Sequence, residues 1–490
     1  MILDSEARTD DWFADKTFDV CVIGSGPAGA TIAHRLGARG FTVGLFEAGG
    51  LLLTPDSQDL YQGTSTGTPQ YYDLTACRLR YFGGSSNHWG GWTRPLDAYD
   101  FKPKAHNPLS GWPIDRSALD IYAGEADAIL HLPLDSAPAD FFDDHPPELI
   151  PRLFRFSRPT TRFGELYKDD FDKSANVTVY LNANLVDMRL GDSLKTVSEA
   201  VFQSYEKPGR FSVKARAFAL CLGGLEEPRF LLNANSQIPP GLGNENDLVG
   251  RYFLEHAHAP VGRVVVRQPL TRMICYSPSP EFMNEKQILN FGLRIGSFDE
   301  WNRADFTGAL DPQPACTIDF DALLKAEMAG EKPACLAMVG DAFVACEQSL
   351  NPDNRVTLTD TRDRFGLREM NLNWTLSDMD RRTLKTAATQ VAERMAGADV
   401  GRMRVLPWLL NDEMPNKDQV FGGNHHMGTT RMSADPKTGV VDADCKVHAL
   451  ANLYVGGSSV FATSGHANPT YSITQLALRL GDHLTTVLRA

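Results

Sequence analysis

The sequence predicts an α/β protein in which a Rossmann-like dinucleotide-binding unit is combined with a second unit built on an antiparallel sheet with flanking helices. Three features of the 490 residues support this prediction. A strand, a glycine-rich turn, a helix and a second strand follow one another near the N-terminus. Alternating apolar runs fill the middle of the chain, and a short apolar strand and a long helical pattern end it.

The first unit begins with FDVCVIGSGPAGATIAHRLGARGFTVGLFEAGG, residues 18–50. The apolar run 20–23 is typical of a buried parallel strand. Residues 28–39 predict a helix that ends near Gly40, and residues 42–46 predict the next strand. A strand, a glycine turn, a helix and a strand in this order are typical of a nucleotide-binding unit.

Three glycines and one acidic residue carry the chemistry of this unit. Gly24, Gly26 and Gly29 form G-x-G-x-x-G: the first makes a tight turn, the second lets the backbone approach a pyrophosphate, and the third lets helix and strand pack closely. The phosphates then meet the helix N-terminus, where free N–H groups point outward. Glu47 ends the second strand and can bind ribose hydroxyls, which argues against NADP. The motif by itself does not separate NAD from FAD.

A second glycine-rich loop, YFGGSSNHWGGWTRPLDAYDF, covers residues 81–101. Its glycines and small polar residues do not fit a regular helix or strand, and they offer many backbone N–H groups to a flat polar ring. We therefore expect Gly84, Ser85, Asn87 and His88 to contact a cofactor. From the residues alone, His88 is an ordinary hydrogen-bonded histidine, a cofactor contact without a bond, or a point of covalent attachment.

The closing segment contains two adjacent histidines, His425 and His426, in GGNHHMGTTRM, residues 422–432. Their spacing is that of neither a metal pair nor a hydrolase triad. Further on, NPTYSITQLALRLGDHL has helical periodicity, so Asn468 is a natural N-cap with Pro469 at the first helical position. The N-terminus of that helix favours negative charge.

Together these motifs resemble the glucose–methanol–choline (GMC) flavoprotein oxidoreductases. The dinucleotide motif, GGSSNHWGG, HHMGTTRM and SSVFATSGHANPT stand in the order found in that family. Segments 215–232, 248–258 and 351–374 also resemble family segments, so the resemblance covers most of the chain. SNHW, GTTRM and ANPT are similar to the pyranose oxidase and sugar dehydrogenase branch.

The resemblance implies an FAD cofactor and a reaction in which a histidine takes the proton of an alcohol while a hydride passes to flavin N5. The family's catalytic histidine stands three residues before the glycine of the Gly-Thr pair, which is His425 here, with His426 as the second choice. Its partner falls on Asn468. Imidazole titrates near neutral pH and an amide both donates and accepts hydrogen bonds, so both residue types suit these roles.

Further cofactor contacts implied by the resemblance are a backbone contact of Val186 to adenine and contacts of Gly457, Ser458 and Pro469. Many relatives have an aspartate where this chain has Gly457, so the contact there is expected from backbone N–H groups and Ser458. Relatives with a histidine at the position of His88 often carry the flavin covalently and others do not, so both states stay open.

The resemblance also predicts a discontinuous FAD-binding domain of residues 15–105, 175–257 and 420–490. A substrate-binding domain would consist of residues 106–174 and 258–419. Within the second domain, the alternating runs VGRVVVRQ and ILNFGLRIGSF predict antiparallel strands, and DRRTLKTAATQVAERM predicts an amphipathic helix.

The composition limits the partners of the protein. A formal net charge of −13 argues against nucleic acid, and no apolar stretch is long enough to span a membrane. The N-terminal stretch lacks the features of a secretory signal. The eight cysteines form no C-x-x-C pair, which predicts reduced thiols and no metal site. We therefore expect a cytoplasmic protein without a membrane partner.

These observations predict FAD-dependent oxidation of a secondary hydroxyl of a sugar or glycoside to a ketone, with dioxygen or another molecule as electron acceptor. The alternatives are oxidation of a non-sugar alcohol by the same mechanism, a flavin-bound lyase without net redox change, and a binding protein that keeps the nucleotide fold. The sequence predicts no particular oligomeric state.

Overall fold

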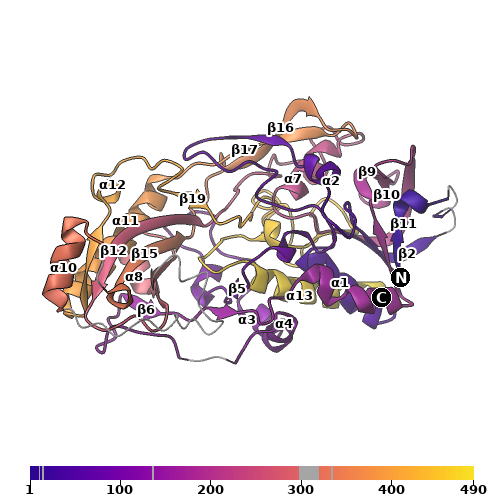
Figure 1. The fold of residues 1–490 in the computed structure, drawn as a ribbon. Coiled ribbons are helices and arrows are strands. Elements are labelled where there is room, and N and C mark those ends of the chain that lie inside the picture. The colour runs from indigo at the N-terminus through magenta and orange to yellow at the C-terminus, as the bar shows by residue number, and fades with distance from the viewer. Residues whose placement is uncertain (10–11, 14–15, 135–136, 297–318, 333–334) are drawn as a thin grey trace.

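A computed structural model describes residues 1–9, 12–13, 16–134, 137–296, 319–332 and 335–490. The molecule is elongated, with one large sheet towards each end (Figure 1). Both termini lie at the same end, beside the first sheet, and the C-terminal segment (yellow) runs through the region between the sheets.

The sheet beside the termini is mostly parallel. Its strands among the described residues are β1 (Ile2–Asp4), β2 (Thr17–Ile23), β3 (Val43–Phe46), β8 (Val177–Leu181), β9 (Asn184–Leu190), β10 (Val197–Gln203), β11 (Arg210–Leu220) and β20 (Leu453–Val455). They follow the order β1-β8-β3-β2-β11-β10-β9, and β20 pairs with β11. The pairs that β10 makes with β9 and β11 are antiparallel, and the other pairs are parallel.

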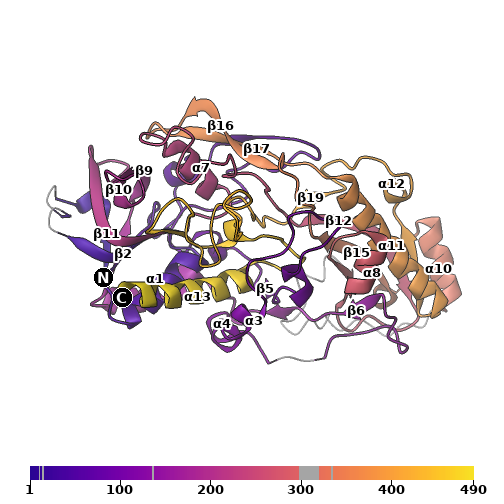
Figure 2. The same cartoon turned by 180° about the vertical axis from the view of Figure 1, so that it is seen from behind.

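The predicted strand–helix–strand unit is confirmed by β2, α1 (Pro27–Ala38) and β3. The end of β2 is fully apolar and buried, as expected for a parallel strand that is covered on both faces. Helix α1 begins at Pro27, one residue before the predicted start, because the first turn needs no N–H from that residue. It lies against α13 (Thr470–Arg489), the amphipathic helix that ends the chain (Figures 1 and 2).

The second sheet is antiparallel, as predicted. Its strands among the described residues are β6 (Leu149–Pro151), β12 (Ala257–Val266), β13 (Ile274–Pro278), β14 (Phe291–Gly296), β15 (Val339–Cys346), β18 (Gly401–Val405) and β19 (Phe421–Gly422). The order is β18-β12-β15-β14-β13-β6, and β19 pairs with β12. Residues 297 and 298 of the second predicted run lie outside the described residues.

Helix α11 (Asp378–Gly397) confirms the predicted amphipathic helix. It packs on β12, β14 and β15 through a buried apolar face that includes Leu384, Ala388 and Val391. Ser377 caps its N-terminus, where the side chain accepts a hydrogen bond from the backbone N–H of Asp380.

The remaining elements are smaller. Strands β4 (Gly63–Thr66), β16 (Arg355–Arg362) and β17 (Arg368–Asn373) form a third sheet, and β5 (Trp92–Thr93) pairs with β7 (Arg155–Phe156). The other described α-helices are α2 (Pro55–Asp59), α3 (Ser117–Asp120), α4 (Ala123–Ile129), α5 (Phe163–Leu166), α6 (Lys168–Lys173), α7 (Glu226–Asn233), α8 (Pro280–Lys286), α10 (Phe320–Ala329) and α12 (Pro407–Leu410).

Four strands do not keep to the predicted domain ranges. Strand β1 joins the first sheet although it precedes residue 15. Strands β4, β5 and β19 come from ranges predicted for the FAD-binding domain, yet β4 pairs with β17, β5 with β7 and β19 with β12. These crossings bring segments of both ranges together between the sheets. The division into two domains stays a prediction.

The described cysteines are not all reduced. Cys335 is disulfide-bonded, so the expectation of reduced thiols is wrong at that residue. The cysteines therefore no longer support a cytoplasmic location. The free cysteines among the described residues are all buried: Cys21, Cys77, Cys221, Cys275, Cys346 and Cys445.

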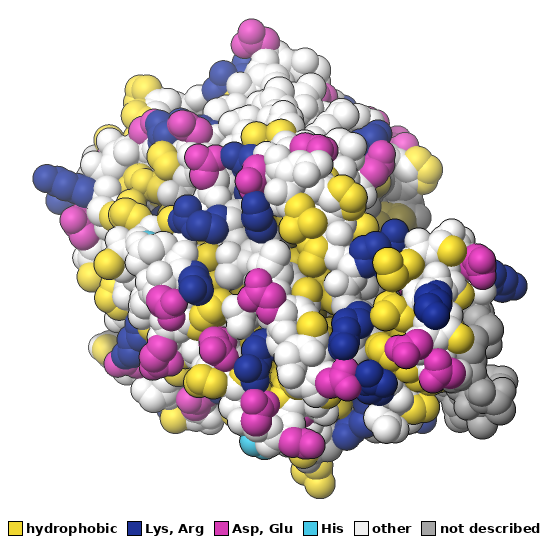
Figure 3. Space-filling view, turned by 90° about the vertical axis from the view of Figure 1, so that its left-hand side faces the viewer, with side chains coloured by type: hydrophobic (Ala, Val, Ile, Leu, Met, Phe, Trp, Pro, Cys, Tyr) yellow, Lys and Arg dark blue, Asp and Glu magenta, His cyan; other side chains and the backbone are white. Residues whose placement is uncertain are grey.

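The face of the molecule shown in Figure 3 carries charges of both signs. The face in Figure 3, at the end of the molecule that carries α10 and α12, shows Lys and Arg (dark blue) interspersed with Asp and Glu (magenta), and histidine scarcely reaches it. Among the described helices, none combines the length and the apolar character that a membrane crossing requires.

Candidate active site

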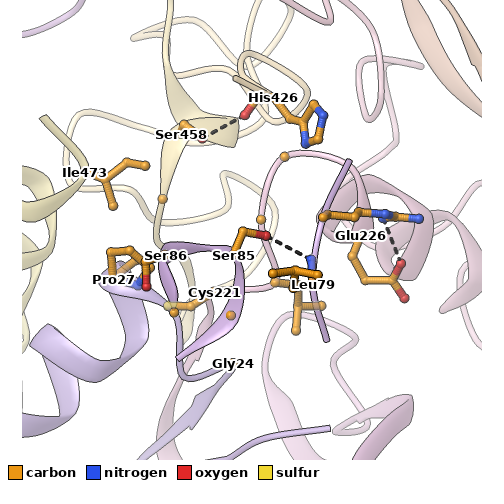
Figure 4. A pocket seen from close by; sticks show the side chains of 18 of the residues that line it. Gly24, Pro27, Leu79, Ser85, Ser86, Cys221, Glu226, His426, Ser458 and Ile473 are labelled. Carbon is orange, nitrogen blue, oxygen red and sulfur yellow. Dashed lines mark hydrogen bonds and ion pairs between the residues drawn. The ribbon is translucent and has the colours of Figure 1, made fainter. Parts of the chain in front are cut away.

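A cavity of about 670 Å³ is lined by residues that belong to both large sheets and to the C-terminal segment. Its volume is in the range of small-molecule and cofactor sites. One wall is the end of β2 and the start of α1, which is where parallel sheets bind ligands. Figure 4 shows this part of the cavity, with Gly24 and Pro27 near one side and Ser458 and His426 near the other.

The three glycines of the turn after β2 have different surroundings. A Cβ atom on Gly29 would lie 1.9 Å from the carbonyl oxygen of Gly24, and one on Gly24, whose φ is +97°, would lie 2.3 Å from the carbonyl oxygen of Cys221. Added to Gly26, a Cβ atom would meet nothing within 4 Å. Gly24 and Gly29 therefore allow the turn and the helix to pack, whereas Gly26 leaves the backbone open towards the cavity.

Glu47 lines the cavity and also holds the glycine turn in place. Its carboxylate accepts hydrogen bonds from the backbone N–H and hydroxyl of Ser25, at 3.0 and 2.6 Å, and from the backbone N–H of Gly49 at 2.9 Å. A carboxylate has lone pairs for about four such bonds, so it can still accept from a ligand hydroxyl.

The second glycine loop packs against the first. The 3-10 helix η2 (Gly84–Asn87) follows Gly83, whose backbone N–H donates to the hydroxyl of Ser25 at 2.9 Å. Ser85 accepts from the backbone N–H of Leu79 at 3.0 Å, as the dashed line in Figure 4 shows. Gly84, Ser85 and His88 line the cavity, and the His88 ring packs edge-on against Tyr81.

Two expected cofactor contacts are not on the cavity wall. The side chain of Asn87 donates to the carbonyl of Phe82 at 2.7 Å and accepts from the backbone N–H of Gly164 at 3.0 Å, so it holds the loop. Val186 is buried in a separate apolar cluster. Side chains alternate along a strand, so Leu185 of β9 faces the cavity and the Val186 side chain faces away. The backbone contact of Val186 to adenine stays a prediction.

The other residues predicted to contact the cofactor belong to the C-terminal segment. Gly457, Ser458 and Pro469 line the cavity. A Cβ atom on Gly457, whose φ is +116°, would approach Ala28 at 4.0 Å, so this backbone is open. Ser458 donates its hydroxyl to the carbonyl of His426 at 2.7 Å, which joins the two parts of the segment (Figure 4).

His425 and Asn468 lie side by side on the cavity wall. The amide nitrogen of Asn468 is 3.3 Å from Nε2 of His425. The predicted N-cap is wrong: α13 begins at Thr470 and Pro469 is its cap residue, without a side-chain cap. The amide of Asn468 therefore serves the histidine and does not cap the helix.

His426 also lines the cavity, but Tyr71 holds its ring. The Tyr71 hydroxyl donates to the Glu255 carboxylate, and Nε2 of His426 lies 3.0 Å from the same hydroxyl oxygen. That oxygen has given its hydrogen to Glu255, so Nε2 of His426 must carry a hydrogen and cannot take a proton. This arrangement favours His425 over His426 as a base.

The sequence prediction missed three residues behind His425: Glu255, His256 and His258. Glu255 accepts from the backbone N–H groups of His425 at 2.9 Å and of His256 at 2.8 Å. Nδ1 of His256 is 2.9 Å from Nδ1 of His425. A signal existed, because the stretch LEHAH places three ionisable residues where an apolar strand begins.

Burial keeps these imidazoles neutral. It lowers the pKa of His425 well below its ordinary value, and the neighbouring His256 and His258 lower it further. Burial lowers the pKa of His256 to about 4 and that of His426 to about 3. It also raises the pKa of Glu255 to about 7, against the hydrogen bonds that favour its charged form. A neutral imidazole beside the cavity keeps a nitrogen lone pair that can accept a proton, and its lowered pKa makes it a weak base.

The ring nitrogens of His256, His258 and His425 lie within 4.8 Å of one another, a spacing that three metal ligands could have. The Nδ1 atoms of His256 and His425, however, are already in hydrogen-bond contact at 2.9 Å. Burial lowers the pKa of the nearby Arg294 only to about 10, so a positive charge stays beside the cluster and repels a cation.

Known proteins provide an independent comparison. Residues 351–477 match the family model described as GMC oxidoreductase. The chain is 26% identical to 2-methyl-1,2-propanediol dehydrogenase of Mycolicibacterium austroafricanum over 96% of each chain. It is 28% identical to C-glycoside 3-oxidase of Microbacterium trichothecenolyticum over 34% of this chain and 30% of that one. The solved structure of pyridoxine 4-oxidase from Mesorbium loti superposes with a TM-score of 0.57 and 18% identity, over 95% of this chain and 99% of that one.

Proposed function

Because residues 351–477 match the GMC oxidoreductase model and the chain is similar to a dehydrogenase over 96% of its length, we propose that it is a GMC oxidoreductase that uses FAD to oxidise a secondary hydroxyl of a sugar or glycoside to a ketone. One observation carries the proposal. His425 and Asn468 stand 3.3 Å apart on the wall of a cavity that also contains an open glycine turn at a helix N-terminus.

The residues of the cavity fit FAD. The backbone at Gly26, Gly223 and Gly457 lines the cavity, and no side chain at these positions fills the space beside it. This open backbone suits a pyrophosphate and a ribityl chain. Glu47 is placed to accept from ribose hydroxyls. The loop that contains Ser85 offers backbone N–H groups to a flat ring system. When bound, FAD supplies the acceptor for a hydride, which no side chain can be.

The side chains of the cavity perform the proton chemistry. The neutral His425 takes the hydroxyl proton of the substrate at Nε2, the nitrogen that faces Asn468. The Asn468 amide then donates to the substrate oxygen and holds it beside Nε2, so that loss of the proton accompanies loss of the hydride from carbon.

A specific observation favours a second substrate class. The relative that matches 96% of the chain is named for a small diol, whereas the relative named for a glycoside matches 34%. A contact on the cavity wall keeps the sugar as the first candidate. Arg294 stacks on Trp92 at 5.0 Å, and an aromatic side chain with polar neighbours suits a sugar ring. Oxidation of a non-sugar alcohol is therefore the second candidate.

Anaerobic reduction of the bound flavin tests both candidates. We expect pyranoses or glycosides to bleach the yellow absorbance faster than 1,2-diols do, and His425→Ala to abolish the bleaching. Faster bleaching by the diols would select the second candidate. Conversion of a substrate with the flavin still oxidised would contradict both and support a lyase. Re-oxidation by air or by a dye then identifies the class of electron acceptor.

His88 is the proposed point of a covalent bond to the flavin. It lines the cavity in the loop where some members of the family carry such a bond and others do not. With the bond in place, acid precipitation leaves the yellow colour in the pellet, and His88→Ala releases it into solution. A colourless pellet from the unchanged protein removes the bond from the proposal.

A further inference from the structure

We propose that His256 is a positioning residue, which determines the nitrogen of His425 that carries the hydrogen and so leaves Nε2 of His425 free to act as the base. The inference rests on the proposed function and adds to it a residue that does not touch the substrate. It depends on a chain of contacts that runs from a backbone carbonyl through two imidazoles to the cavity.

This series of contacts begins at the carbonyl oxygen of Ser464. Nε2 of His256 lies 3.3 Å from this oxygen, and both residues are fully buried. A carbonyl oxygen can only accept, so Nε2 of His256 carries the hydrogen. Burial lowers the pKa of His256 to about 4, which keeps the ring neutral. A neutral imidazole has one N–H group, so Nδ1 of His256 has a free lone pair.

The second contact determines which ring nitrogen of His425 carries the hydrogen. Nδ1 of His425 is 2.9 Å from Nδ1 of His256, and the ring planes cross at 77°. Since His256 offers a lone pair there, His425 must donate its Nδ1 hydrogen. Its lone pair then lies on Nε2, beside the cavity. The Asn468 amide agrees independently, because its nitrogen lies 3.3 Å from Nε2 and can only donate.

The arrangement has a consequence for proton transfer. The O–H bond of the alcohol breaks and an N–H bond forms at Nε2 of His425. A flavin bound in the cavity would accept the hydride that the carbon loses as the C=O bond forms. His425 becomes a cation that still donates its Nδ1 hydrogen to His256. Without His256, a hydrogen on Nδ1 of His425 would lack an acceptor, which shifts the ring towards the tautomer with hydrogen on Nε2 and removes the lone pair of the base.

The other ionisable groups around His425 do not offer this acceptor. Glu255 binds the backbone N–H groups of His425 and His256 and so fixes the main chain. The His258 ring lies edge-on to the His425 ring at 5.9 Å. Arg294 only donates, and Nε2 of His426 is bound to Tyr71. His256 is therefore the residue in this group that faces Nδ1 of His425.

Two variants of similar volume test the proposal in the flavin-loaded enzyme. His256→Asn keeps an oxygen acceptor near the position of Nδ1, and His256→Leu removes it. We expect His256→Leu to slow anaerobic flavin reduction about 10- to 100-fold, and His256→Asn to recover most of that rate. Flavin content and melting temperature are measured for both, since a merely structural role would lower these in parallel with the rate.

Nitrogen NMR of protein labelled in histidine adds a readout without turnover. The resonances of His425, identified by their loss in His425→Gln, should show hydrogen on Nδ1 in the unchanged protein and on Nε2 in His256→Leu. Hydrogen on Nε2 in the unchanged protein would overturn the inference, as would full activity of His256→Leu, or one equivalent of bound zinc that His256→Asn loses. Full activity of His425→Gln would instead contradict the proposed function.

Discussion

Two parts of the cavity wall perform different tasks and are built in different ways. The glycine turn at residues 24–29 is built from consecutive residues, and Glu47, Gly83 and Cys221 pack against it from further along the chain. The histidine group joins His256 to His425, which are 169 positions apart, and Asn468 to His425, which are 43 apart. The turn uses backbone geometry, whereas the histidine group uses side-chain nitrogens.

The comparison shows which changes each part can tolerate. The turn depends on the absence of side chains, so almost any added atom at Gly24 or Gly29 meets backbone. The histidine group depends on hydrogen-bond direction, so a change that preserves volume can still remove its function. The first part should therefore respond in stability and cofactor retention, and the second in turnover.

The largest expected effect separates the adjacent histidines. His425→Ala should lower kcat about 10²- to 10⁴-fold, because the reaction loses its base. His426→Phe should lower kcat less than about tenfold, because the Nε2 atom of His426 already binds Tyr71. Rapid-mixing measurement of flavin reduction distinguishes the two, and equal losses in both variants would contradict the assignment of the base.

Asn468→Ala should have the next largest effect. Removal of the amide takes away a donor that holds the substrate oxygen, which typically costs about 10²-fold in kcat. The melting temperature should change little, because the Asn468 side chain does not cap α13. A large loss of stability with unchanged turnover would show that this amide is structural.

The glycine turn offers a matched pair of changes. Gly29→Ala places a Cβ atom 1.9 Å from the carbonyl oxygen of Gly24 and should destabilise the protein by about 1–3 kcal/mol. Gly26→Ala meets no protein atom within 4 Å, so we expect an unchanged melting temperature without cofactor and weaker retention of FAD. Thermal unfolding and flavin content measure the two effects. Equal stability loss in both variants would remove the distinction between the glycines.

The smallest expected effect concerns pH. Burial lowers the pKa of His426 to about 3 from an ordinary value of 6.5, so between these values the unfolded chain binds a proton that the folded protein does not. This group therefore makes stability fall as pH falls through that window. His426→Phe should reduce the slope of unfolding free energy against pH by up to about 1.4 kcal/mol per unit. Denaturant unfolding at several pH values measures it, and an unchanged slope contradicts the buried neutral state.

The sequence by itself determined the local parts of this protein. The strand–turn–helix around Gly24, the antiparallel strands and helix α11 were predicted, because periodicity and glycine spacing act over a few residues. The pairing of His425 with Asn468 came from the resemblance to a family.

Only the tertiary structure decided the rest. It brought His256 and Glu255 behind His425, and it turned the Val186 side chain away from the cavity. It also placed Asn87 where its side chain holds the loop, and α13 begins after Asn468. The physical reason is that hydrogen-bond partners of buried polar groups are chosen by the fold and not by position in the chain. Which of two identical side chains can accept a proton depends on those partners.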